Sequence, residues 1–139
     1  MHLTAFTDFG LRVLMRLAAD PARTFTTDGI ARDLGVSRHH LAKVVRGLAA
    51  AGFVAARRGT GGGFRLARPA GAITLGAVVR ALETDRALVE CFRPDGGACA
   101  LTPGCRLRAR LAGAREAFLR ELDGTTLAQC AHPPAGRAA

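Results

Sequence analysis

The segment from Thr26 to Ala67 constrains the fold more than any other part of the sequence. Thr26-Thr27-Asp28 is typical of a helix start and predicts a short helix that continues to Leu34. Gly35-Val36-Ser37 then predicts a tight turn, after which apolar residues recur at helical spacing at Leu41, Val44, Val45 and Leu48. Two helices joined by a short glycine turn predict a helix-turn-helix, although an ordinary helical hairpin has the same pattern.

The exposed face predicted for the second of these helices is basic. Opposite the apolar stripe it carries Arg38, His39, Lys43 and Arg46. A DNA-recognition helix reaches base edges with the residues near its N-terminus. The residues predicted to read DNA are therefore Ser37, Arg38, His39, His40 and Lys43.

A β-hairpin is predicted after this helix. Two strand-like runs, Phe53–Ala56 and Phe64–Ala67, flank the glycine-rich turn Gly59–Gly63. A nucleotide-binding loop is rejected because a strand follows the glycines and the lysine of such loops is absent. The hairpin is interpreted as the wing of a winged helix-turn-helix domain, and the side chains predicted to contact the DNA backbone or the minor groove are Arg57, Arg58 and Arg65.

The charge of the chain agrees with a nucleic-acid ligand. The formal net charge is +9 over 139 residues, and Lys43 is the single lysine among 20 lysines and arginines. The planar guanidinium group of arginine suits phosphates and guanine edges. A basic composition also serves solubility alone, so the charge favours DNA binding without establishing it.

Three further helices are predicted, over Thr4–Ala19, Leu75–Glu83 and Arg106–Leu122. The last has an apolar stripe formed by Leu107, Leu111, Ala114, Phe118 and Leu122. Because little of its own chain is available to cover it, we expect this helix to form a dimer seam or to fold back on the first helix.

The expected fold class is mostly α with a small β-hairpin wing. We expect a winged helix-turn-helix DNA-binding domain over residues 1–72 and a cluster-binding loop with a long dimerisation helix over 73–128. A disordered tail is expected over 129–139. No signal peptide opens the sequence and no apolar run reaches the roughly 18 residues that cross a bilayer, so we expect a cytoplasmic protein.

Three of the four cysteines lie in Val89–Arg108, where glycines and prolines predict a loop. Seven residues separate Cys91 from Cys99, and five separate Cys99 from Cys105. In a cytosolic chain this clustering indicates metal or redox chemistry rather than structural disulfides. The gaps are wide for a zinc finger and suit an iron–sulfur cluster, but zinc binding and unliganded thiols both stay open. Cys130 is interpreted as a free cysteine.

Four stretches of the sequence carry a resemblance to one family of regulators: Leu3–Leu14, Ser37–Val45, Gly59–Ala67 and Leu88–Phe92. Together they resemble the NsrR repressors, which are nitric-oxide sensors in the Rrf2 family of winged-helix regulators. The resemblance implies a homodimer that binds a palindromic operator and carries an iron–sulfur cluster on Cys91, Cys99 and Cys105, with [4Fe-4S] favoured over [2Fe-2S]. It also implies that nitric oxide modifies the cluster and lifts repression.

The sequence departs from its relatives at two places. The first cysteine gap is slightly longer than is usual in the family. The related IscR regulators of cluster biogenesis have a histidine three residues after the last cysteine, where this chain has Arg108. Arginine has no lone pair to donate, which favours nitric-oxide sensing over a regulator of iron–sulfur supply or redox stress. A DNA-binding protein with structural zinc also stays open, whereas a small redox enzyme is disfavoured because the sequence has no Cys-x-x-Cys and no cofactor motif.

The resemblance also implies a role for Asp8, which matches an aspartate in the family's Phe-Thr-Asp-Tyr/Phe segment that looks like a cluster-ligand site. We therefore expect Asp8 to be the fourth ligand, reaching the cluster from the second subunit. A carboxylate near a helix start also suits an ordinary ion pair with Arg12, four residues on, so both interpretations stay open. The operator, the regulated genes and the number of irons are not determined by the sequence.

Overall fold

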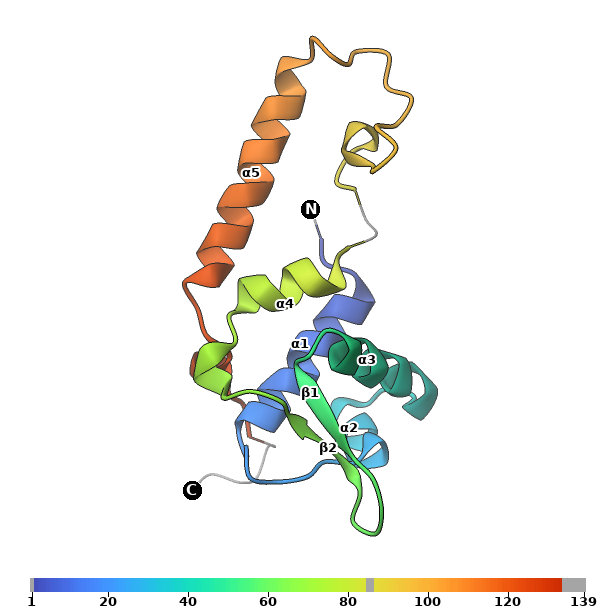
Figure 1. Cartoon of the computed structure of the whole chain (residues 1–139), viewed down its shortest axis with the longest axis vertical. Coiled ribbons are helices and arrows are strands. Elements are labelled where there is room, and N and C mark those ends of the chain that lie inside the picture. Colours follow the sequence, from blue (N-terminus) through green and yellow to red (C-terminus); the bar gives the residue numbers. More distant parts are fainter. Residues whose placement is uncertain (1, 85–86, 134–139) are drawn as a thin grey trace.

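The computed structural model describes residues 2–84 and 87–133. In this part of the chain the elements are helical except for one antiparallel hairpin, which confirms the predicted fold class. Figure 1 shows a helical body from which the hairpin extends at one end, while α5 and the loop before it extend at the other. The elements are α1 (Ala5–Ala18), α2 (Thr27–Leu34), α3 (Arg38–Ala50), β1 (Val54–Arg57), β2 (Gly63–Leu66), η1 (Ala70–Ala72), α4 (Leu75–Leu82), η2 (Glu90–Phe92), α5 (Arg106–Asp123) and η3 (Leu127–Cys130).

Hydroxyl side chains define the starts of α1, α2, α3 and α4. Each one accepts a hydrogen bond from a backbone N–H three residues later, which satisfies a donor that the first turn of a helix leaves unpaired. Gly35 ends α2 with a left-handed backbone (φ 65°) and so makes the turn into α3. The capping bonds join Thr4 to Thr7 (3.1 Å), Thr26 to Gly29 (3.1 Å), Ser37 to His40 (3.2 Å) and Thr74 to Ala77 (3.2 Å).

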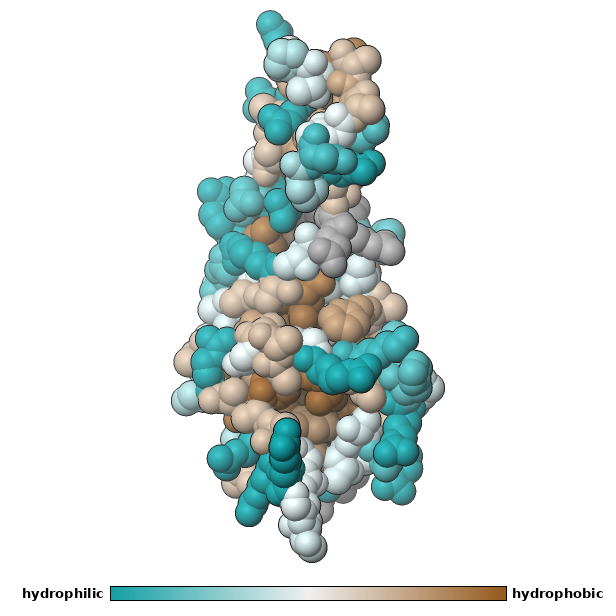
Figure 2. Space-filling view, turned by 45° about the vertical axis from the view of Figure 1, so that its right-hand side comes forward, coloured by the Kyte–Doolittle hydropathy of each residue, from teal (hydrophilic) through white to brown (hydrophobic). Residues whose placement is uncertain are grey.

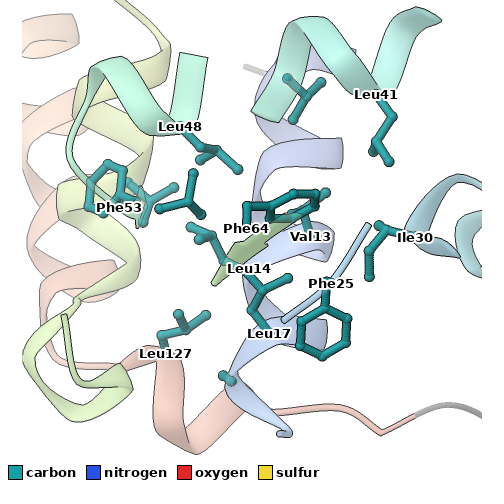
Figure 3. Packing of buried hydrophobic residues seen from close by; sticks show 14 of the residues in the cluster. Val13, Leu14, Leu17, Phe25, Ile30, Leu41, Leu48, Phe53, Phe64 and Leu127 are labelled. Atoms are coloured by element: carbon teal, nitrogen blue, oxygen red, sulfur yellow. The ribbon is translucent and has the colours of Figure 1, made fainter. Parts of the chain in front are cut away.

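The hydrophobic core is built around α1. Val13, Leu14 and Leu17 are buried on its inner side, and Figure 3 shows them among side chains from α2, α3, β2 and η3. The apolar stripe predicted for α3 supplies Leu41, Val44 and Leu48, which are all fully buried. The 3.6-residue period of both helices thus places their stripes against each other.

The wing is anchored to the body by a phenylalanine pair. β1 and β2 pair in an antiparallel register that sets Val54 opposite Leu66 and Ala56 opposite Phe64. Phe64 also exchanges two backbone hydrogen bonds of 2.8 Å with Phe25, the residue before the α2 cap. Both rings are buried, so the base of the wing is part of the core while its tip is exposed.

The core continues past residue 72 into the C-terminal part of the chain. Ile73, Val78 and Leu127 belong to the same cluster as the α1 residues, and the Leu127 N–H donates to the Ile73 carbonyl at 2.8 Å. The predicted boundary between 72 and 73 therefore does not separate two cores.

The buried side chain of Arg16 holds the C-terminal segment against α1. It pairs with Asp33 of α2 at 2.8 Å and donates to the carbonyl of His132 at 3.2 Å. The N–H of His132 in turn donates to the Met15 carbonyl at 3.1 Å. The first residues of the segment predicted as a tail are thus bound to α1, and residues 134–139 of it lie outside the described residues.

The C-terminal end of α5 is joined to α4 by a bidentate ion pair. The Arg80 guanidinium donates to both carboxylate oxygens of Asp123, at 2.6 and 2.7 Å. These hydrogen bonds hold the pKa of the Asp123 carboxyl below its ordinary value. Leu119 is buried at the same junction, so this end of α5 is fixed to the body.

We expect Gly76→Ala to destabilise the fold at this junction. A Cβ at Gly76 would lie 2.8 Å from the carbonyl oxygen of Leu119 and would collide with the Asp123 carboxylate. Overpacking against backbone costs about 1–3 kcal/mol, and denaturant unfolding measures it. Gly113→Ala on α5 is the matched control: nothing lies within 4 Å of its Cβ, so a gain of up to about 1 kcal/mol in helix propensity is expected. Equal stability of Gly76→Ala and the wild type would contradict the tight α4–α5 packing.

Candidate functional site

The N-terminal turn of α3 is exposed and polar. Its cap, Ser37, lies directly after the glycine turn, so the residues that follow begin a helix at the surface of the body. Arg38 is 75% exposed in its side chain and contacts Asp28 of α2 through Nε at 2.8 Å. The residues predicted to read DNA that the structure places at the surface are Ser37, Arg38, His39 and Lys43.

His40 is placed differently from the rest of this predicted set. Its ring packs edge-on against Phe9 of α1, with ring centroids 5.1 Å apart and planes at 75°. Its Nε2 atom is buried and has no hydrogen-bond partner within the described residues. Positions 37 and 40 are one helical turn apart, so periodicity alone predicts both side chains on the exposed face. Packing against α1 instead turns the His40 ring inward. We therefore interpret His40 as a contact between α1 and α3 rather than as a reader of bases.

The three arginines predicted for the wing are all exposed. Arg57 is the last residue of β1, and Arg65 lies on β2 opposite Ala55. Arg58 begins the turn between the two strands. Two more arginines extend this cationic surface at the base of the wing and were missed by the sequence analysis: Arg23 lies over the Phe25 ring and Arg68 over the Phe53 ring, each at 5.0 Å. Stacking on a ring holds an arginine in place, but no sequence pattern marks such a pair.

The cysteine loop projects from the body, as Figure 1 shows. Cys91 is buried in η2, whereas Cys99 and Cys105 are partly exposed, and all are free thiols. Gly97 turns the loop back with φ 61°, where a Cβ would collide with the Glu90 carbonyl. Arg108 of α5 lies over the Phe92 ring at 5.9 Å and so contacts η2 across the loop.

The donor set of this loop fits a thiophilic metal centre. Three free thiols within one loop are suitable ligands for iron–sulfur clusters or zinc. No three His, Cys, Asp or Glu side chains in the described part of the chain are gathered closely enough to hold a metal ion. Cys130 lies in η3, which packs against α1 at the opposite end of α5 from the loop.

Asp8 lies in the first turn of α1, where the structure pairs it with Arg12. The two side chains approach to 2.8 Å, and Arg12 Nε donates to Asp8 Oδ1 at 3.1 Å. Asp8 keeps 45% of its side chain exposed, so its carboxylate stays accessible to a second partner. Arg12 also lies over the Phe9 ring at 5.5 Å, which connects Asp8 to the α1–α3 contact.

The apolar stripe predicted on α5 is covered unevenly by its own chain: Leu107 and Ala114 are exposed, whereas Leu111, Phe118 and Leu122 are partly buried. Leu107 is 62% exposed, and Leu119 is the buried residue of this helix. Figure 2 views a different face, on which apolar surface lies across the middle of the body between hydrophilic side chains. Among the residues described, no helix has the length and hydrophobicity to span a lipid bilayer.

A helix-turn-helix with a cationic wing defines the chain as a winged-helix transcriptional regulator rather than an enzyme. It belongs to the Rrf2 family, described as an iron-dependent transcriptional regulator, whose profile matches residues 3–133. The chain is 47% identical over 129 residues to the HTH-type transcriptional regulator NsrR of Geobacillus kaustophilus (strain HTA426), covering 92% of this chain and 88% of that protein. The resemblance to the NsrR group is therefore confirmed.

Solved structures share the fold. The global cysteine regulator CymR of B. subtilis is 27% identical with a TM-score of 0.75, covering 94% of this chain and 96% of that chain. IscR of T. potens is 23% identical with a TM-score of 0.70, covering 92% and 84% of the two chains.

Two arginine substitutions should have different effects on DNA binding. Arg38→Gln removes a side chain at the start of α3, so it should cost about 1–3 kcal/mol on the preferred site and change the sequence preference. Arg58→Gln removes a wing cation, so it should weaken all sequences alike and reduce the salt slope by about 1. Fluorescence anisotropy on a preferred and a scrambled duplex measures both. If neither substitution affects DNA binding, then this surface is not the DNA-binding surface.

Proposed function

We propose that the protein is a cytoplasmic transcriptional repressor that holds an iron–sulfur cluster, binds a palindromic operator as a homodimer, and releases it when nitric oxide modifies the cluster. The observation that carries this proposal is the combination of three free thiols on one projecting loop with an exposed cationic recognition helix in the same Rrf2-family chain.

The exposed N-terminal part of the α5 stripe supports the homodimer. A helix fixed to the body at Leu119 but bare at Leu107 has an apolar face that a second copy of the same helix would cover. Two copies related by a twofold axis present two recognition helices, so the matching DNA has two inverted half-sites. The palindromic operator follows from this symmetry.

Cys91, Cys99 and Cys105 of one copy, with Asp8 of the second copy, are the ligands we propose. When bound, the cluster supplies iron that reacts with nitric oxide, most readily where a carboxylate replaces a thiolate. The backbone N–H and hydroxyl of Thr4 donate to Glu83 Oε1 at 2.7 and 2.8 Å, which ties the start of α1 to the end of α4, from which the chain leads to the cysteine loop.

The residues around Asp8 provide a route from the cluster to the DNA-binding surface. Within its own chain Asp8 pairs with Arg12, which lies over Phe9, and Phe9 packs against His40 at the start of α3. A change of partner at Asp8 alters the turn of α1 that supports α3. Because two half-sites tolerate little movement between recognition helices, a small shift is enough to release the operator.

Titration with nitric oxide tests the proposed function directly. Protein purified without oxygen should be brown, and nitric oxide should bleach it and release operator DNA over the same range of added equivalents. Colourless protein containing zinc would contradict the cluster. Release by peroxide or an iron chelator with nitric oxide inert would instead support a regulator of iron–sulfur supply or redox stress.

Substitution of the ligands tests the proposed set. Cys91→Ala, Cys99→Ala and Cys105→Ala should each abolish a stable chromophore and weaken operator binding, because each removes a thiolate. Cys130→Ala is the control and should leave both nearly intact, since Cys130 lies on η3. Visible absorption and anisotropy measure the two properties. A chromophore lost in the Cys130 variant alone would overturn the set.

Asp8→Ala tests the proposed fourth ligand by the same two measurements. We expect a chromophore that is altered or lost more quickly in air, together with weaker operator binding. Arg12→Ala, which removes the intrachain partner of Asp8 but leaves its carboxylate, is the control for the chromophore only, because Arg12 lies on the proposed route to α3. If Asp8→Ala changes neither the spectrum nor the rate of reaction with nitric oxide, then Asp8 is only a salt-bridge residue.

A further inference from the structure

The contact between Asp28 and Arg38 joins the two helices of the helix-turn-helix. Asp28 lies in the first turn of α2 and Arg38 is the first residue of α3. Asp28 Oδ1 approaches Arg38 Nε at 2.8 Å, across a shallow hollow that Arg32 also lines. Because Nε is the guanidinium nitrogen nearest the chain, the two terminal amino groups of Arg38 lie farther out along the side chain.

A carboxylate at this place is unfavourable for general DNA affinity. Residues 21–82 contain two carboxylates, Asp28 and Asp33, and Asp33 pairs with the buried Arg16. Asp28 is the more exposed of the two, with 60% of its side chain accessible against 42% for Asp33, and it is the one that contacts the recognition helix. A negative charge there repels phosphates, which dominate the affinity of proteins for DNA of any sequence.

Fold stability does not explain the pair. Exposed ion pairs contribute little to stability, because water and salt screen them. The start of α2 is already capped by Thr26, whose hydroxyl accepts from the Gly29 N–H at 3.1 Å, so Asp28 adds only a screened charge near the helix dipole. The remaining effect of the contact is on the orientation of Arg38.

We propose that Asp28 is a specificity-determining residue that positions Arg38 for a base edge and keeps it from phosphates. This inference rests on the proposed DNA-binding function and adds a role for a residue outside the recognition helix. Held through Nε, Arg38 presents its terminal amino groups, which match the two acceptors of guanine in the major groove. An unrestrained arginine at the same position would bind phosphates of any sequence equally well, and discrimination would fall.

Asp28→Asn in the full-length protein tests this role. Affinity is measured for a duplex selected by the wild type from a random pool and for a scrambled duplex of equal length, at several salt concentrations. The ratio of the two affinities should fall roughly fivefold or more, because the scrambled duplex is bound more tightly and the contact to the base is less well oriented. The salt slope on scrambled DNA should steepen by about 0.9 per protomer as Arg38 gains a phosphate.

Further variants separate positioning from simple charge repulsion. In an Arg38→Ala background, Asp28→Asn should leave the affinity ratio unchanged, because there is no guanidinium to position. Arg38→Lys, which keeps the charge but loses the fork, should lower the ratio by itself. Glu121→Gln, which removes an exposed carboxylate from α5, is the net-charge control and should leave the ratio as in the wild type.

The outcomes distinguish this inference from the proposed function. If Asp28→Asn raises affinity for both duplexes by one factor, with or without Arg38, then Asp28 only repels DNA and the positioning role is overturned. An unchanged ratio in Asp28→Asn also overturns it, while the proposed function stands. A wild-type protein that does not distinguish the two duplexes would refute specific DNA binding itself and the inference with it.

Discussion

Burial of the apolar side of α1 is the interaction on which the rest of the structure depends. Val13 and Leu14 are fully buried, and α1 contacts α2, α3, α4, β2 and η3. Core side chains that pack this closely transmit displacement, since a close-packed interior has few voids to absorb it. The helix that carries Asp8 is therefore also the support of α3, so a displacement at the start of α1 would reach α3.

Polar contacts determine how the peripheral segments are attached to this helix. The Thr4–Glu83 bonds connect the start of α1 to the end of α4, and the buried Arg16 connects its last turn to α2 and the C-terminal segment. A buried guanidinium without partners would be costly, so the contacts of Arg16 with Asp33 and His132 are needed where they occur. Together they make the segment before the cysteine loop and the DNA-binding surface parts of one packed unit.

Surfaces that the chain does not cover are where function is expected. The N-terminal part of α5 and the cysteine loop extend beyond the body, and Leu107 and Leu101 are exposed there. At the other end, arginines surround the wing and the start of α3, and Asp28 contacts one of them, Arg38. The two ends are joined by α1 and α4, which is the arrangement that the proposed function requires.

Most of the fold was predictable from the sequence because it depends on local patterns. Hydroxyl caps, the left-handed Gly35 and the 3.6-residue stripes define α1 to α4 within a residue or two, and paired strand patterns define the wing. Four of the five residues predicted at the start of α3 are exposed, as helical periodicity requires. The inward ring of His40, the Asp28–Arg38 contact and the shared core of Ile73 and Leu127 were decided by tertiary structure. They join elements whose separation and angle are set by packing, and no local pattern encodes that geometry.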